Sequence, residues 1–167
     1  DGQPGTLVYA GDSEFLTKER TAGAYHQISV GEKEENDYII SSVDDFGLDG
    51  IKFSLEHEGA ARQIQLPLPG RHNAVNSAIA VAIGDLLGVS EEEEARGLMA
   101  ADLTGNRLKK RENGGVCVID DTYNASPDSM KSALRVLERS SCKGRRVAVL
   151  GDMYELGEDS GQQHFDV

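Results

Sequence analysis

The chain has 167 residues, a length that suits one compact domain or parts of two. Its 17 basic and 29 acidic residues give a formal net charge of −12, which disfavours a nucleic-acid partner because binding to phosphate backbones needs clustered Lys and Arg. No apolar run approaches the ~20 residues of a membrane span, so we expect a cytoplasmic protein with no membrane span.

Short strands are predicted for the first part of the chain. Residues 6–10 predict a strand, and Gly11-Asp12-Ser13 then offers a turn and an N-cap for a helix that runs to about residue 20. Four further stretches alternate or run apolar between glycines and acidic residues, a pattern typical of a β-meander. These stretches lie around residues 25–30, 37–43, 49–57 and 61–66.

Two helices are predicted next. The stretch from Pro69 to Leu87 is rich in Ala, Ile, Val and Leu and is closed by Gly88, so it predicts a helix with a C-terminal stop. Because this helix is nearly apolar all round, we expect it to be deeply packed. Ser90 and the glutamates after it predict an N-cap and a first turn that complements the helix dipole, in a helix that ends near Ala101.

An α/β unit is predicted after a break at residues 102–107. Its order is strand (108–112), glycine turn (113–115), strand (116–120), helix (127–139), strand (145–150) and the start of a helix (158–167). The apolar runs at 116–120 and 145–150 are typical of strands buried in a parallel sheet and joined by a right-handed crossover. Two parallel strands make a poor independent core, so we expect a piece cut from a longer parent soon after Val167.

Asn73 and Asn76 form the first polar cluster. They are three residues apart at a helix start, so their amides project from one face and offer donors and acceptors to the edge of a heterocycle. Capping and helix packing explain the same pattern equally well, and the residues alone leave both interpretations open.

Arg107 belongs to the second cluster, residues 104–107. Gly105 permits unusual backbone angles there, and the planar cation of Arg107 suits phosphate or ribose oxygens. A solvated hinge arginine is the simpler interpretation of this pattern.

Asp120, Asp121 and Asn124 form the third cluster, in a polar loop directly after a predicted buried strand. Two adjacent carboxylates repel, so one of them needs a partner such as ribose hydroxyls, a cation or a helix N-terminus. The alternative is a capping loop in which Asp and Asn satisfy local backbone groups. The position and the residue types together favour a ligand site.

Four strings in this order resemble the Mur ligase family: LPLPGRHNAVNSAIAVAIGDLLG, LTGNR, VIDDTYNASPDSMKSAL and RRVAVLGDMYELGEDSGQQH. The resemblance is strong over residues 64–167 and loose over residues 1–63. It implies an α/β fold made of the later part of a central Mur-ligase ATPase domain, a mixed sheet with helices, over residues 1–104. Residues 105–167 would open an incomplete C-terminal Rossmann-like domain.

The resemblance also implies a chemistry. The third and fourth strings are similar to those of the ligase that joins D-alanyl-D-alanine to UDP-N-acetylmuramoyl-tripeptide, through an acyl phosphate, with ATP and Mg²⁺ in peptidoglycan synthesis. By motif, Asn73 and Asn76 would contact adenine, Arg107 and Asp121 ribose or phosphate, and Asn124 would border the same cleft, while His72 would position the loop. The parent enzyme is expected to be a monomer.

The chain departs from the family's full set of motifs. It contains no GxxxxGK[ST] phosphate loop, and the family's metal-binding Glu and His and its carbamylated Lys would precede Asp1. We therefore expect no catalytic residue and no metal ligand within this chain, and no activity from it alone. Gly11 and Asp12 replace part of an expected Asn-x-Asp pattern, which leaves Asp12 a tentative site.

Two other functions are compatible with the residues. One is a non-catalytic nucleotide-binding or interaction module that keeps the same cleft without chemistry. The other is a related amide ligase, such as a folylpolyglutamate synthase.

Overall fold

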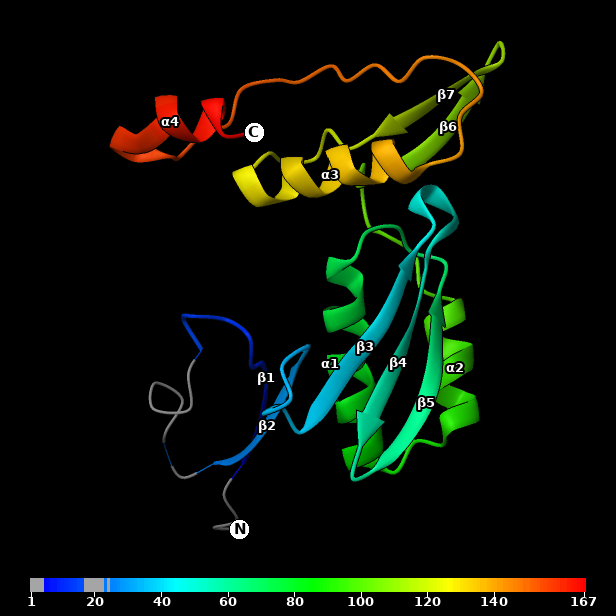
Figure 1. Cartoon of the computed structure of the whole chain (residues 1–167), viewed down its shortest axis with the longest axis vertical. Helices are drawn as coiled ribbons and strands as arrows, with labels where there is room; N and C mark the ends of the chain where they lie inside the picture. Colours follow the sequence, from blue (N-terminus) through cyan, green and yellow to red (C-terminus); the bar gives the residue numbers. More distant parts are fainter. Residues whose placement is uncertain (1–4, 17–22, 24) are drawn as a thin grey trace.

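The computed structural model describes residues 5–16, 23 and 25–167. Within these residues, five strands form one sheet in the order β1-β2-β3-β4-β5, and β6 and β7 form a separate hairpin (Figure 1). The strands of the sheet are β1 (Thr6–Ala10), β2 (His26–Gly31), β3 (Tyr38–Asp45), β4 (Ile51–His57) and β5 (Ala60–Leu66). All five predicted strands are therefore confirmed.

The sheet is mixed, with β1, β2 and β3 parallel and β3, β4 and β5 antiparallel. The predicted meander is confirmed only from β3 onward. The helix predicted after β1 is wrong where it can be seen, because residues 11–16 form turns, and its remaining residues 17–20 lie outside the described residues. The Asp12 carboxylate accepts hydrogen bonds from the backbone beyond β2 instead of opening a helix, at 2.6 Å from Glu32 N.

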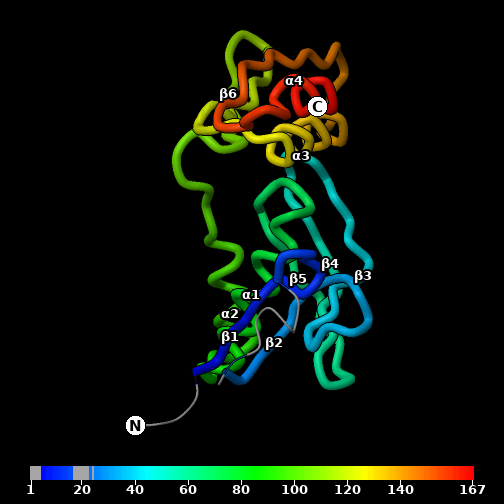
Figure 2. Tube along the Cα trace, turned by 90° about the vertical axis from the view of Figure 1, so that its left-hand side faces the viewer, coloured from blue at the N-terminus to red at the C-terminus, as the bar shows by residue number. Residues whose placement is uncertain are grey.

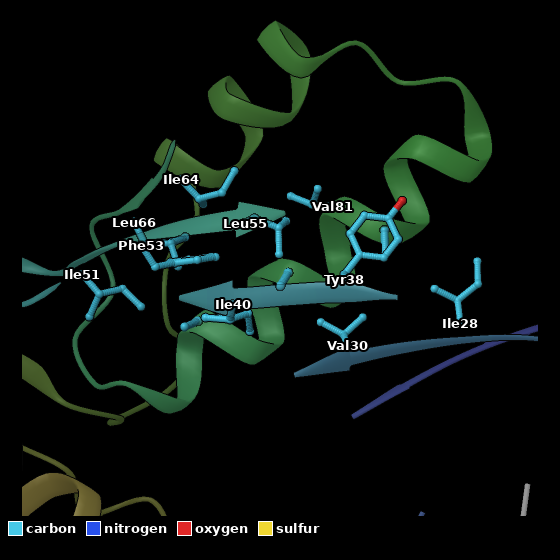
Figure 3. Packing of buried hydrophobic residues seen from close by; sticks show 13 residues of the cluster. Ile28, Val30, Tyr38, Ile40, Ile51, Phe53, Leu55, Ile64, Leu66 and Val81 are labelled. Atoms are coloured by element: carbon cyan, nitrogen blue, oxygen red, sulfur yellow. The ribbon is translucent and has the colours of Figure 1, made fainter. Parts of the chain in front are cut away.

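Helix α1 (His72–Leu87) covers the sheet and ends at Gly88, whose φ of 73° is left-handed and whose N–H caps the last turn. It contacts β1 to β4. The prediction of deep packing all round is only half right, because Leu86 and Leu87 are 47% and 76% exposed. One face carries the core, which Figure 3 shows gathered between strands and helix; its members are Ile28, Val30, Tyr38, Ile40, Ile51, Phe53, Leu55, Ile64, Leu66, Ala74, Ala78, Val81 and Ala82.

Helix α2 (Glu91–Met99) begins with the predicted Ser90 cap, a capping box in which Ser90 and Glu93 bond reciprocally. It contacts β5 and α1. The Arg62 guanidinium of β5 bonds Asp85 of α1 and Glu94 of α2, the latter at 3.0 Å. Tyr38 donates its hydroxyl to the same Asp85 at 2.9 Å. A polar network thus fixes α2, and with it the start of the segment that leaves the sheet.

The hairpin of β6 (Lys109–Asn113) and β7 (Val116–Asp120) is followed by α3 (Pro127–Arg139), and we call these three elements the hairpin unit. Both strands and the helix were predicted, as was the Ser126 cap, but the expected burial of β7 is wrong, because Val116 and Val118 are 61% and 46% exposed. The two strands are antiparallel. Farther along, a 3₁₀ turn η2 (Gly157–Asp159) leads into α4 (Ser160–Phe165). None of the helices formed by the described residues is long and apolar enough to cross a membrane.

The strand predicted at residues 145–150 is wrong. These residues are all described and form no strand, and Val147 and Val149 are 69% and 93% exposed. The Arg146 guanidinium donates to Leu137 O at 3.0 Å and to Ser140 O at 2.8 Å, so the segment is held at the C-terminal end of α3. Its backbone therefore lacks a strand partner, and the predicted βαβ crossover is not formed.

The buried carboxyl of Glu94 makes the contribution of this polar network to stability depend on pH. Its side chain is 6% exposed, and Oε1 has no hydrogen-bond partner. Burial, and then the Asp85 carboxylate, raise the pKa of Glu94 above 4.5, whereas hydrogen bonds to Ser90 lower the pKa of the exposed Glu93. A raised folded pKa contributes stability that is lost as the pH rises through it, and a lowered one contributes stability that appears as the pH rises.

We expect urea unfolding from about pH 4 to about pH 8 to separate the two glutamates. Relative to Glu94→Gln, the wild type should lose free energy of unfolding as the pH rises above 4.5. Glu93→Gln is a matched change of one charge on the same helix. Relative to this variant, the wild type should gain free energy of unfolding as the pH rises through the acid range. Parallel pH curves for the wild type and Glu94→Gln would contradict the assignment.

Candidate functional site

The start of α1 is built by its own side chains. Gly70 has a φ of 93°, and its carbonyl accepts Asn73 N at 3.0 Å. The buried Asn73 side chain donates from Nδ2 to Pro69 O at 2.8 Å. Arg71 forms two hydrogen bonds with the Glu32 carboxylate, which raise its pKa and tie the helix start to the loop after β2. The first turn is therefore fixed before any ligand binds.

Asn73 and Asn76, the predicted adenine pair, contact one another. Asn76 Nδ2 donates to Asn73 Oδ1 at 3.2 Å. Asn73 thus uses both ends of its amide inside the protein, as the capping interpretation expected. Asn76 is exposed, and within the described part of the chain its Oδ1 accepts no hydrogen bond. An open amide edge therefore lies at Asn76 and depends on Asn73 for its orientation.

Arg107 and Asp121 lie together at the base of the hairpin unit. The Arg107 guanidinium stacks on the Tyr123 ring, 4.4 Å from its centroid. Asp121 Oδ1 accepts the N–H of Leu108 at 3.0 Å. Tyr123 N also donates to Asn106 O at 3.2 Å. The segment before β6 is thereby bound to the loop after β7.

The other predicted residues of this loop face solvent or neighbouring side chains. Asp120 pairs with Arg111 at 3.0 Å, and the Thr122 hydroxyl and then Arg111 lower its pKa. One of the two adjacent acids was expected to need a partner, and both Asp120 and Asp121 have one. Asn124 is exposed on the loop that leads to the Ser126 cap of α3.

His72 connects the two groups electrostatically. Desolvation lowers the pKa of His72, while the carboxylates of Asp121 and Asp45 act in the opposite direction. Asp121 belongs to the loop after β7 and His72 to the first turn of α1, so the carboxylate lies within electrostatic reach of the imidazole. Asn73 and Asn76 contact neither Arg107 nor Asp121 among the interactions of the described residues.

Tyr123 and Leu108 were missed by the sequence interpretation. Tyr123 supplies the surface on which Arg107 lies, and an aromatic residue close in sequence to the acidic pair was the available signal. Leu108 adopts a φ of 46°, which is uncommon for a non-glycine residue, and no sequence pattern indicated it.

Asp12 lies at a cavity of about 560 Å³ at the carboxyl ends of β1 and β2. Its carboxylate accepts hydrogen bonds from Glu32 N, Lys33 N and Asn36 Nδ2. Desolvation raises the pKa of Asp12, but these bonds outweigh it and bring the pKa below its ordinary value. Asp12 therefore stabilises the loop after β2.

Within the described ranges, no group of three or more His, Cys, Asp or Glu residues could hold a metal ion. The predicted site residues are three amides, a carboxylate and a guanidinium. They offer an open amide at Asn76 and a planar cation at Arg107, groups that suit the base and the sugar-phosphate part of a nucleotide.

Comparison with known proteins matches both parts of the chain. The profile of the Mur ligase middle domain matches residues 2–84, and that of the Mur ligase, glutamate ligase domain matches residues 106–167. A UDP-N-acetylmuramoyl-tripeptide–D-alanyl-D-alanine ligase of Bacillus subtilis (strain 168) is 34% identical over 157 residues, which cover 93% of this chain and 33% of the relative.

Solved structures of Mur ligases also resemble this chain. MurF from Acinetobacter baumannii superposes with a TM-score of 0.85 at 32% identity, over 99% of this chain and 35% of that one. MurF ligase from Thermotoga maritima, in complex with ADP, superposes with a TM-score of 0.79 at 25% identity, over 98% and 37%. The chain spans about a third of the length of the relatives that it matches.

The hydrogen bond from Leu108 N to Asp121 should protect the segment before β6 from proteolysis. Asp121→Ala should speed tryptic cleavage after Arg107 roughly threefold to tenfold, because the Leu108 N–H loses its acceptor and the segment opens more often. Mass spectrometry of timed digests measures this rate. Asp102→Ala, which removes an exposed carboxylate from the same connecting segment, should leave it unchanged. Equal rates for the two variants would show that Asp121 does not hold the segment.

Proposed function

Because the chain belongs to the Mur ligase family, we propose that it is part of an ATP-dependent ligase that joins D-alanyl-D-alanine to UDP-N-acetylmuramoyl-tripeptide in peptidoglycan synthesis. The observation that carries the proposal is the match of both family domains, in order, in a chain that aligns over 93% of its length with a ligase of that name. We propose a cytoplasmic, monomeric enzyme.

We place the boundary between its central and C-terminal domains after residue 104. The bonds that join Asn106 to Tyr123 and Leu108 to Asp121 support this position, because they bind the segment from Gly105 onward to the hairpin unit. Residues 1–104 would then belong to the central ATPase domain and residues 105–167 to the C-terminal one.

ATP would supply the phosphoryl group that activates the carboxylate of the tripeptide. In this chain, Asn76 would bind the adenine edge with its open amide, and Asn73 would hold that amide in place from inside the helix start. Arg107, which lies over the Tyr123 ring, would present its guanidinium to ribose or phosphate oxygens. Asp121 and Asn124 would border the same cleft. The Thermotoga maritima relative is in complex with ADP, which supports a nucleotide ligand for the parent protein.

The chain spans about a third of the length of its relatives, and we propose that the Mg²⁺ expected for the family and the cradle for the nucleotide phosphates are supplied by the rest of the parent protein. The described residues hold no suitable metal cluster, and the sequence has no GxxxxGK[ST] loop. The contribution of this chain is therefore positioning: it would orient the base and sugar, and bring the hairpin unit against them.

The test is an assay of the complete protein that contains this chain. We expect release of ADP only when UDP-N-acetylmuramoyl-tripeptide and D-alanyl-D-alanine are both present. Replacing the dipeptide by L-alanine, or both substrates by folate and glutamate, should abolish the release. Turnover with folate and glutamate would identify a folylpolyglutamate synthase instead, and nucleotide binding without turnover would identify a non-catalytic module.

The two asparagines are predicted to differ in that assay. Asn76→Ala should weaken ATP use by about 1 to 3 kcal/mol, seen as a higher KM for ATP, with a smaller fall in melting temperature than Asn73→Ala because its bond to Asn73 Oδ1 is only part-buried. Asn73→Ala should raise the KM and also lower the melting temperature, because the buried carbonyl of Pro69 loses its donor. An unchanged KM for ATP in Asn76→Ala would remove Asn76 from the adenine site.

A further inference from the structure

The 3₁₀ turn η1 (Gly47–Asp49), which follows β3, contacts the C-terminal end of α3. Ser140 is 7% exposed there, and its hydroxyl both accepts and donates a hydrogen bond. The hydroxyl accepts the N–H of Leu48 at 3.1 Å and donates to Val136 O at 2.6 Å. A buried hydroxyl thus joins a backbone group of the sheet unit (β1–β5, α1 and α2) to a helix of the hairpin unit.

The approach at Gly47 is too close for any other residue. Gly47 has a φ of 62°, and a Cβ added there would lie 2.5 Å from Ser140 N. The missing side chain therefore lets the end of α3 settle against the turn. Both the left-handed backbone conformation and the lack of space for a Cβ at this position require glycine.

Asp45, the last residue of β3, adds a charged contact to the same place. Its side chain is 8% exposed, Oδ1 accepts Gly47 N at 2.9 Å, and Oδ2 lies 3.9 Å from Arg139 Nε of α3. From the start of α1, Arg71 and His72 also lie within its field, and Asp45 acts to raise the pKa of both. One buried carboxylate therefore lies within electrostatic reach of one cation from each unit, Arg71 and Arg139.

These contacts lie apart from the covalent connection between the units. Figure 2 shows the segment after α2 rising along one side of the molecule to β6, while the turn after β3 reaches α3 on the other side. A single flexible connection would leave the hairpin unit free to rotate. A second attachment at a distance from the first fixes its orientation.

We propose that Asp45, Gly47, Leu48, Arg139 and Ser140 form a latch that sets the orientation of the hairpin unit, and with it the position of Asp121 opposite His72. Asp45 and Ser140 act as positioning residues. The importance of the latch for nucleotide binding rests on the function proposed above. The latch itself exists in the chain without nucleotide, so its tests are independent of that function.

The first test uses Ser140→Ala with Ser141→Ala as control, because Ser141 is the adjacent, exposed serine. In the nucleotide-free chain, amide exchange of Leu48 measured by NMR should accelerate about fivefold to tenfold in Ser140→Ala and stay unchanged in Ser141→Ala. Residual dipolar couplings should fit one alignment tensor for both units in the wild type and two in Ser140→Ala. One common tensor in Ser140→Ala, with unchanged exchange at Leu48, would overturn the proposal.

The second test separates charge from hydrogen bonding. Asp45→Asn keeps an acceptor for Gly47 N but removes the charge that faces Arg139, Arg71 and His72. NMR titration should show a lower pKa for His72 in Asp45→Asn, together with two alignment tensors. Asp44→Asn, an identical charge change at the exposed neighbour, should alter neither. An unchanged His72 titration in Asp45→Asn would show that the carboxylate does not face the start of α1, and would overturn its role in the latch.

Discussion

Carboxylates that accept backbone N–H groups hold the loops at the strand ends, and the rest of the structure depends on these bonds. Asp12 holds Glu32 and Lys33 after β2, and Asp45 holds Gly47 after β3. Asp121 holds Leu108 before β6 in the same way. A hydrogen bond to a charged acceptor stabilises more than one to a neutral acceptor, so each carboxylate favours the loop shape in which its N–H partners can reach it. These acids add to the negative charge of the chain, and their carboxylates accept hydrogen bonds from its own backbone.

The same bookkeeping of donors and acceptors separates side chains that build the fold from side chains that can meet a ligand. Asn73 and Asp121 are occupied by Pro69 O and Leu108 N. Asn76 keeps an open acceptor, and Arg107 is held by its contact with the Tyr123 ring. Occupied and open groups alternate within each cluster, so a site built from them is oriented before the ligand arrives.

Much of the fold was predictable because local signals agreed with the final packing. The Ser90 and Ser126 caps and the stop at Gly88 mark helix ends that depend on their own neighbours. Residues 145–150 show the opposite case. Their apolar run predicts a buried strand, but a strand also needs a partner edge, and Arg146 holds the segment at the end of α3. Helix α1 was judged by composition, which cannot tell which apolar face is covered.

The candidate residues were predictable as residue types, but their roles were not. Two asparagines three apart indicate a shared face; only the buried carbonyl of Pro69 shows that one of them is structural. Asp45 and Ser140 carried no motif, because their importance arises from elements 95 residues apart that meet in space, as the bond from Leu48, 92 residues before Ser140, illustrates. Sequence spacing indicates contacts within one helix or hairpin. Contacts between units require the fold.

The polar character of the latch has a consequence for motion. An apolar interface resists separation because apolar surface returns to water, whereas the Leu48 N–H and the Ser140 hydroxyl can each exchange their partner for water at modest net cost. Asp45 and Arg139 likewise regain solvation when they part. Directional polar contacts therefore define one orientation of the hairpin unit without locking it. An interface of this kind lets two units part and then return to the same relative orientation.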